Sequence, residues 1–446
     1  MFQTLKRAWS VPEIRKKLLY TLLMVVIFRL GSAIAVPYLN TEVVNAWMDS
    51  NAVNGNFLEY LNTITGGALS QATIFSLSIT PYINASIIMQ LLTYALPPLE
   101  RLRDEGEEGR KKLNKITGYV ALALSVVLGV GYYMILRRMT GVTDNDGNLL
   151  GDALKYADGG YGIYAAIVII VTFVAGASFV VWMGNRISDK GIGNGVSMLL
   201  FAGIAARFPV DAGKLIGYTI EEPAKYLWVT LGYLVFIIFE FGFIVFMNEA
   251  ERRIPIQYAK RVVGRKQYGG QKTHIPMNVM MSGVMPIIFA MSFMALPQTI
   301  QLFKENPHDG SFYSKFCDFF STRSLGYAAI YFVLIIAFNY FYVSIQYNPV
   351  EIANNLRQSN GGIPGIRPGK PTADYIQRVL SKISLVGAIF LGIIAVIPIF
   401  FSMADEKLNH MSMGGTTILI AVSVALETTR TLESQLMMRH HKGFLS

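Results

Sequence analysis

The stretch "ITGGALSQATIFSLSITPYINAS" (residues 64–86) is too apolar for a solvated loop, yet a pair of glycines and Pro81 interrupt it. The segment 65–77 would extend roughly 20 Å as a helix, which is too short to cross a hydrocarbon core of about 30 Å. We therefore expect a half-length helix that lies against protein or in a water-filled cavity, because lipid offers its backbone ends no hydrogen-bond partners. Proline disfavours helix in the residue before it, so a break near Thr80 is expected to separate this piece from a full span. A re-entrant packing helix and a movable stopper in a pore both fit the pattern.

The composition places this stretch in a membrane protein. Of the 446 residues, 52% are hydrophobic and only 15% are charged, whereas a soluble protein carries nearer a quarter charged residues. Windows of about 20 apolar residues recur along the chain, which is the length of a membrane-spanning helix. The fold class expected is an all-α polytopic membrane protein. The single cysteine, Cys317, excludes an internal disulfide and a cysteine-built metal site. The first apolar run is a full span followed by others, so it is not read as a cleaved signal peptide.

The lysines and arginines give the orientation of the chain. Ten transmembrane helices are expected, at about 18–38, 73–97, 116–136, 161–183, 195–209, 226–247, 277–302, 324–346, 383–403 and 415–436. Most of the 39 Lys and Arg residues then fall in the termini and in every second loop. The positive-inside rule places that face, and both termini, in the cytoplasm. The net charge of +10 lies mainly on this face, where it would attract anionic lipid headgroups or a polyanionic partner.

Ten spans divide into an N-terminal half, 1–210, and a C-terminal half, 211–446, with five spans each. Two halves with an odd number of spans are inverted relative to each other if they share a fold, and such pairs form a site at their interface. The halves show no direct sequence repeat, so the expectation rests on the span count.

A basic loop follows the sixth span, "ERRIPIQYAKRVVGRKQYGGQKTHIP" (residues 251–276). Its "IPIQYA" alternates apolar and polar residues and its "GRK" reads as a turn, which predicts a strand–turn–strand projection. Arg265 and Lys266 would lie at the tip. A loop that only sets topology is the simpler interpretation. An ordered basic tip better suits a partner rich in phosphates or carboxylates.

A second cytoplasmic loop contains "GGIPGIRPGKPT" (residues 361–372). Its prolines restrict the backbone and its glycines allow tight turns around one guanidinium, that of Arg367. A solvated turn arginine is the commoner case, but this much restraint favours a fixed docking contact.

Catalysis finds little support in the sequence. The five histidines lie in loops or the tail without metal-ligand spacing, and no carboxylate pair or nucleophile–base set stands out. The "GIGNG" at 191–195 lacks a preceding strand, so it more simply lets the next span begin close to a neighbour. Charges within spans are few, namely Arg29, Glu240, and Glu427 with Arg430. An ion-coupled secondary solute transporter, the main alternative from another class, would need such groups at mid-depth.

The segments above resemble the SecY family, the channel-forming subunits of the bacterial Sec protein translocase. The resemblance runs almost from end to end, in blocks that include "GGALSQATIFSLSITPYINASIIMQLL", "EGEEGRKKLNKITGY", "DKGIGNGVSMLLFAGI" and "NPVEIANNLRQSNGGIPGIRPGKPTADYI". It implies two inverted five-helix halves hinged between spans 5 and 6. It further implies a half-helix plug at about 64–78 and cytoplasmic loops at about 248–276 and 347–382. The function implied is a protein-conducting channel of the bacterial cytoplasmic membrane, without catalytic activity or cofactors. Such a channel passes unfolded secretory polypeptides across and releases transmembrane helices sideways into lipid.

The family also implies a pore ring and a plug that closes it. Carried over by motif, the ring consists of Ile79, Ile83, Ile87, Val196, Leu200, Ile288 and Ile420. The plug includes Thr65, Gly66, Gly67, Ala68, Leu69, Ser70, Thr73 and Ile74. A ring without hydrogen-bonding groups gives an ion no substitute for its water, and it still yields around many side chains. Val196 and Leu200 stand where isoleucine is usual in the family, and Thr80 stands where methionine is common.

Two further sets of residues follow from the resemblance. The lateral gate between spans 2 and 3 and spans 7 and 8 would carry Ser86, Gln90, Thr117, Asn278 and Ser282. The docking surface for the SecA motor and for ribosomal RNA would carry Arg253, Arg261, Arg265, Lys266, Arg367 and Lys370. The partners implied are the SecE and SecG membrane subunits, SecA, the ribosome, signal peptides, nascent polypeptides and the phospholipid bilayer.

Overall fold

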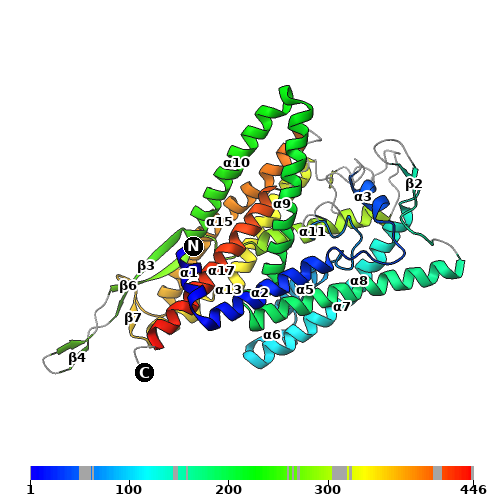
Figure 1. The fold of residues 1–446 in the computed structure, drawn as a ribbon. Helices are drawn as coiled ribbons and strands as arrows, with labels where there is room; N and C mark the ends of the chain where they lie inside the picture. The colour runs from blue at the N-terminus through cyan, green and yellow to red at the C-terminus, as the bar shows by residue number, and fades with distance from the viewer. Residues whose placement is uncertain are drawn as a thin grey trace.

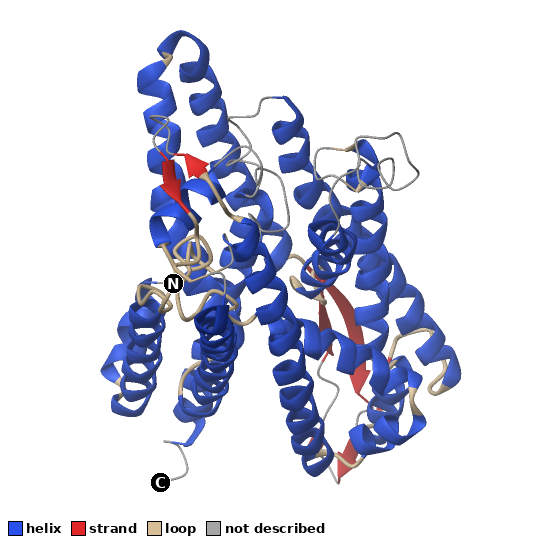
Figure 2. Cartoon of the chain, turned by 90° about the vertical axis from the view of Figure 1, so that its right-hand side faces the viewer, coloured by secondary structure: helices blue, strands red, loops and turns tan. Residues whose placement is uncertain are grey.

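The computed structural model describes residues 2–49, 62, 65–143, 149–156, 159–258, 261–263, 266–268, 272–303, 319–320, 324–404 and 414–442. Long helices make up most of this part of the chain, and the strands are short (Figures 1 and 2). The first part of the chain forms α1 (Phe2–Ser10), α2 (Pro12–Gly31), α3 (Thr41–Asp49), α5 (Thr80–Ala95), α6 (Pro97–Asp104), α7 (Glu107–Arg138), β1 (Val142–Thr143), β2 (Leu149–Gly151), α8 (Gly159–Lys190) and α9 (Gly195–Glu221). The second part forms α10 (Pro223–Glu249), β3 (Glu251–Tyr258), β4 (Arg261–Val263), β5 (Lys266–Tyr268), β6 (Lys272–Asn278), α11 (Met285–Phe303), α13 (Leu325–Gln346), α14 (Pro349–Gln358), β7 (Gly361–Gly362), α15 (Lys370–Ala404) and α17 (Gly414–Lys442).

Five helical segments in the described ranges are long and apolar enough to cross a membrane. They are Glu107–Arg138, Gly159–Lys190, Thr230–Glu249, Leu325–Gln358 and Lys370–Phe400. These match the third, fourth, sixth, eighth and ninth spans expected from the sequence. The other five expected spans fall on α2, α5, α9, α11 and α17, each of which differs from the expected range at one end or both. The expected division between the halves at 210/211 lies inside α9, and the chain breaks its helix at Glu222.

Each half packs mainly on itself. In the first half α5 packs on α7, α7 on α8 and α8 on α9, while in the second α11 packs on α13, α13 on α15, and both α10 and α15 on α17. A small apolar cluster joins the halves. It combines Ile83 of α5 and Ile204 of α9 with Ile288 of α11 and with Ile420 and Val424 of α17. These aliphatic side chains lie where four helices from both halves meet.

The half-length helix expected at 64–78 is not formed. Residues 65–79 fold as a compact series of turns, and α5 begins at Thr80 with Pro81 in its first turn. The backbone has positive φ at Gly66, Gly67, Ala72 and Ser78, which a right-handed helix does not allow. Side chains supply the missing partners instead, since Thr73 Oγ1 and Ser76 Oγ both donate to the Ala68 carbonyl oxygen at 3.1 Å. The predicted break before Pro81 is confirmed, and the prediction of a helix before that break is wrong.

The strand–turn–strand projection is confirmed. Strands β3 and β6 pair antiparallel from Glu251↔Asn278 to Gln257↔Lys272, and β4 pairs with β5. β7 adds to the other edge of β3 through Gln257↔Gly362 and Tyr258↔Gly361, so the sheet order is β6-β3-β7. The two basic loops therefore form one sheet. In Figure 1 this sheet lies on the side of the helices that also holds both chain termini.

Candidate functional site

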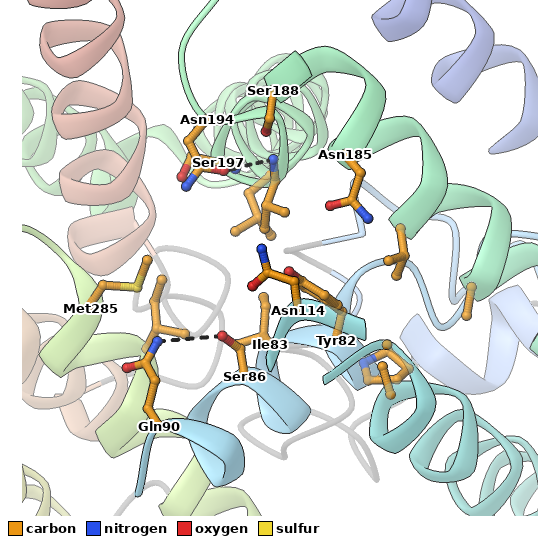
Figure 3. A pocket seen from close by; sticks show the side chains of 18 of the residues that line it. Tyr82, Ile83, Ser86, Gln90, Asn114, Asn185, Ser188, Asn194, Ser197 and Met285 are labelled. Carbon is orange, nitrogen blue, oxygen red and sulfur yellow. Dashed lines mark hydrogen bonds between the residues drawn. The ribbon is translucent and has the colours of Figure 1, made fainter. Parts of the chain in front are cut away.

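A large cavity opens between the two halves, with a volume of about 1220 Å³. Its walls come from α5, α7, α8, α9, α11, α13 and α17 (Figure 3). Three lysines near the start of α7 line it, Lys111, Lys112 and Lys115, and the positive-inside rule predicts that this end of α7 faces the cytoplasm. Another part of the lining is aliphatic and comes from both halves, and we call this part the neck.

The structure brings five of the seven expected ring residues to this neck. Lining residues from both halves include Ile83, Val196, Leu200, Ile288 and Ile420. The other two, Ile79 and Ile87, do not line the cavity. Ile79 is only 1% exposed and packs in an apolar cluster of the first half that also contains Leu200, and Ile87 is buried elsewhere on α5.

Sequence reasoning missed two aliphatic residues that belong to the cluster joining the two halves. Ile204 and Val424 pack with Ile288 and Ile420 and are 4% exposed each. Ile204 follows Leu200, and Val424 follows Ile420, by four residues on the same helix, so both lie on the face that carries an expected ring residue. That spacing is the signal that finds them.

The turns at 65–79 are held against the first half by buried contacts. The Tyr132 hydroxyl of α7 donates to the Leu69 carbonyl oxygen at 2.7 Å. A side chain at Gly176 of α8 would collide with the Ile74 carbonyl oxygen, and a Cβ at Gly66 would lie 2.7 Å from the Gly203 carbonyl oxygen of α9. The expected plug residues Thr65, Ala68, Leu69, Ser70 and Thr73 are buried. The segment is thus seated by close backbone approach as well as by apolar packing.

Two arginines approach the glycine pair of this segment. Relative to a Cβ built on the backbone, Arg29 Nη1 lies 2.7 Å from Gly66, and Arg207 Nη1 lies 3.5 Å from Gly67. Arg29 Nη1 is buried and has no hydrogen-bond partner in the described part of the chain. Glycine at position 66 leaves room for the Arg29 guanidinium group, which a side chain would displace, whereas a Cβ at position 67 would only be in ordinary contact with Arg207.

The expected gate residues do not form one cluster. Gln90 Nε2 and Ser86 Oγ of α5 are 3.5 Å apart, and both side chains line the cavity. Thr117 donates to the Leu113 carbonyl oxygen of its own helix at 2.8 Å. Asn278 ends β6 opposite Glu251. Buried Ser282 donates to Asn339 Oδ1 of α13, which ties it to the second half.

A contact between the halves that the sequence did not reveal lies at the end of α5. The Tyr94 and Phe341 rings meet edge to face with centroids 6.1 Å apart, and the Tyr94 hydroxyl lies 3.5 Å from the Ile345 carbonyl oxygen of α13. The Arg103 guanidinium of α6 stacks 4.7 Å over the Tyr94 ring and also lies 3.3 Å from Asp104. Partial burial lowers the pKa of Arg103, but Tyr94 and Asp104 outweigh it, so the pKa lies above its usual value.

The expected docking residues are spread over the sheet β6-β3-β7, the β4–β5 hairpin and the loop that follows α14. Arg253 is exposed and bonds to Glu251 across 2.6 Å. Arg367 is exposed as well, and its carbonyl oxygen accepts a hydrogen bond from Thr372 Oγ1 at 2.8 Å, which fixes the turn at the start of α15. Lys370 is the first residue of α15. The backbones of Arg261 and Lys266 belong to β4 and β5, while Arg265 lies outside the described residues.

A metal site is absent from the described part of the chain, which holds no group of three or more His, Cys, Asp or Glu residues placed to bind an ion. The arrangement offers no catalytic chemistry in the described part of the chain; it is suited to letting a polypeptide pass while keeping ions and water out. The cavity has an aliphatic neck, and turns packed in the first half lie close to that neck, since Phe75 shares a cluster with Ile79 and Leu200.

Comparison with known proteins gives a consistent result. A family model described as SecY matches residues 73–429. The protein translocase subunit SecY of Streptomyces scabiei is 38% identical over 450 residues, which cover 100% of both chains. The protein translocase subunit SecY of Mycobacterium bovis is 40% identical over 443 residues, or 97% of each chain.

Solved structures share the fold. A protein conducting channel superposes with a TM-score of 0.60 at 18% sequence identity, over 96% of each chain. Sec61 in the canine ribosome–channel complex superposes with a TM-score of 0.58 at 17% identity, again over 96% of each chain.

Proposed function

This chain belongs to the SecY family and is a membrane protein that conducts polypeptides, and we propose that it passes unfolded secretory chains across the bacterial cytoplasmic membrane and releases transmembrane helices sideways into lipid. It is a channel rather than an enzyme. The secondary-transporter alternative is not favoured, since relatives aligned over the whole chain are translocase subunits.

The observation that carries the proposal is the aliphatic neck of the cavity. Ile83, Ile288 and Ile420 come from three helices in both halves and pack in one cluster. A neck without donors or acceptors resists ions and can exclude water, while its flexible aliphatic side chains can move around a threaded chain. The turns at 65–79 serve as the plug that covers this neck when no chain is threaded.

The architecture in the membrane follows from charge and helix order. Residues 1–210 and 211–446 form two inverted five-helix halves, ten transmembrane helices in all, with both termini in the cytoplasm. The sheet β6-β3-β7 and both termini lie on one side of the helices (Figure 1), which supports this orientation. The lateral gate opens between α5 with α7 and α11 with α13.

The partners follow from the two joined basic loops. Exposed Arg253 and Arg367, with Arg265 and Lys266, which the sequence predicts at the hairpin tip, dock a carboxylate-bearing SecA motor or the phosphates of ribosomal RNA through charge-assisted hydrogen bonds. SecE and SecG complete the membrane complex, and signal peptides and nascent polypeptides are its substrates.

Reconstitution tests the proposal. The chain is co-purified with its SecE and SecG, placed in lipid vesicles, and supplied with SecA, ATP and a signal-bearing precursor. We expect the precursor to become protected from added protease only when all components are present. An identical precursor without its signal sequence serves as the control. Equal protection of both precursors, or protection of neither by a correctly inserted complex, would contradict the proposal.

A further inference from the structure

The cavity has two chemically different walls. The wall contributed by the first half carries amides and hydroxyls from three elements, Asn114 of α7, Asn185 and Ser188 of α8, and Asn194 with Ser197 at the start of α9 (Figure 3). The wall contributed by the second half is apolar apart from Tyr342, and consists of Val284, Met285, Ile288, Phe289, Ile420 and Val424. The first half also contributes charged side chains (Lys111, Lys112, Lys115 and Asp189) and apolar ones such as Leu122 and Val181. The amides are therefore confined to one wall, while the opposite wall offers mainly aliphatic and aromatic carbon.

The amides are available to a ligand. Asn114, Asn185 and Asn194 are exposed, and no hydrogen bond joins the side chain of Asn114 or Asn185 to another residue in the described ranges. Asn194 is held in place, because its Oδ1 accepts from the backbone nitrogens of Val196 and Ser197 at 3.0 and 3.4 Å. Three separate elements therefore direct amide groups into one cavity, and few of these groups are already engaged in hydrogen bonds with the protein.

A carboxamide is suited to a ligand of arbitrary sequence. It both donates and accepts hydrogen bonds, as a peptide group does, and it carries no charge that would select for side chains. A hydrogen bond exchanged with water is worth little on balance, so a chain held in this way is released readily, which conduction requires.

We propose that Asn114, Asn185 and Asn194 form a binding subsite for the peptide backbone of extended polypeptide, and that the opposite wall takes apolar helices. This inference rests on the proposed function and adds an orientation step to it. Phe289 of the apolar wall meets Tyr342 of α13 with ring centroids 6.1 Å apart, so a helix on that wall lies next to the gate helices. A polar stretch lies on the opposite wall, along α7 and α8, and so away from the gate helices α11 and α13. Sorting between passage and lateral release begins in the cavity, before the neck.

Site-specific photocrosslinking tests the orientation. A photoreactive amino acid replaces Asn114, Asn185, Val284 or Met285 in the intact complex, and a precursor is stalled during translocation. We expect the polar mature segment to crosslink several-fold more from positions 114 and 185, and the apolar core of the signal to crosslink more from 284 and 285. Equal yields from both walls for both segments would overturn the proposal.

Substitution tests the chemistry. The double variant Asn114→Leu/Asn185→Leu should slow translocation of a polar mature segment by about fivefold, the equivalent of one typical hydrogen bond. It should also raise membrane integration of segments of intermediate hydrophobicity. The matched Asn114→Gln/Asn185→Gln variant keeps the amides and should stay near wild type. Membrane levels of both variants are measured, and the crosslinks from Val284 and Met285 report orientation if the leucine variant accumulates poorly.

The outcomes separate the two proposals. If wild-type complex fails to protect any precursor, the proposed channel function fails. If wild type translocates and the leucine and glutamine variants translocate equally, the backbone-binding subsite alone is refuted.

Discussion

The phenolic hydroxyl of Tyr132 donates a hydrogen bond to the main-chain carbonyl oxygen of Leu69 across 2.7 Å. Tyr132 belongs to the membrane-spanning helix α7 and is 4% exposed, while Leu69 belongs to the turns at 65–79 that we propose as the plug and is 1% exposed. A buried carbonyl oxygen that loses its donor costs free energy. The bond therefore favours the seated plug over the displaced one.

Replacing Tyr132 by phenylalanine should weaken this attachment with little change in packing. Loss of about 1 kcal/mol corresponds to roughly a fivefold shift toward the displaced plug. Planar-bilayer recordings should show more frequent transient openings. The neighbouring Tyr133→Phe variant, which changes a side chain at the edge of the same cluster, is the control. Equal opening frequencies in the two variants would show that the Tyr132 bond does not hold the plug.

Polar substitution in the neck should break the seal. Ile83→Asn or Ile288→Asn places a hydrogen-bond donor and an acceptor among aliphatic side chains. Water can then bind in the neck, and an ion finds a partial substitute for its hydration shell. We expect ion leakage in bilayers and export of precursors with defective signals. Ile87→Asn, on the same helix as Ile83 but away from the cavity, should remain tight. A tight seal in both neck variants would remove these residues from the ring.

Trimming residues 66–73 should leave the helices folded. The segment makes turns rather than a helix, and its removal takes away contacts with one face of the first half only. The trimmed channel should accumulate in membranes and open spontaneously more often. Failure to accumulate, with a tight seal in the surviving molecules, would show that the segment is a structural packing element.

Charge reversal in the cytoplasmic loops should separate docking from insertion. Arg367→Glu should abolish SecA-driven export while the protein stays inserted and bound to SecE. Arg265→Glu should weaken ribosome binding, and the affinity of the wild type should fall with added salt. Lys266→Glu should have the smaller effect, because lysine lacks the bidentate fork of arginine. Arg186→Glu, an exposed cytoplasmic arginine that stacks on Trp182, is the control. Ribosome binding unaffected by salt and by the Arg265 change would reduce this loop to a topogenic signal.

The Tyr94 contact makes a prediction about the gate. Tyr94→Ala removes the edge-to-face contact with Phe341, worth about 1 kcal/mol beyond its burial, and the polar contact with Ile345. The seam between α5 and α13 should open more readily, so that weakly hydrophobic signals are exported. Tyr119→Ala, which removes an exposed tyrosine of α7, should leave the hydrophobicity threshold unchanged. If both variants require the same signal hydrophobicity for export, Tyr94 does not restrain the gate.

Local chemistry in the sequence predicted some of these features well. Pro81 located the start of α5, because proline suits the first helical turn and restricts the residue before it. Alternation of residues located β3, and the turn expected at "GRK" predicted a returning strand, which the structure shows as β6. The plug failed as a helix because glycines at 66 and 67 and the strained backbone at Ala72 and Ser78 favour turns, which an apolar pattern alone does not reveal.

Contacts between helices that are far apart in the chain could not be predicted from the sequence. Tyr94 and Phe341 read as ordinary apolar positions on separate helices, and only the fold brings their rings together. The same holds for the two walls of the cavity, since Asn114 and Asn185 lie on different helices and neither has a local motif. The ring followed from the family resemblance and not from local spacing. Five of its seven residues line the cavity, while Ile79 packs behind them with Leu200.

The pairing of Tyr258 with Gly361 has a mechanical consequence. One loop is anchored in α10 and α11 and the other in α14 and α15, so the shared sheet transmits force between four helices of the second half. We therefore expect a partner that pushes on either loop to displace both pairs of anchoring helices together, whereas two unpaired loops would each bend on their own.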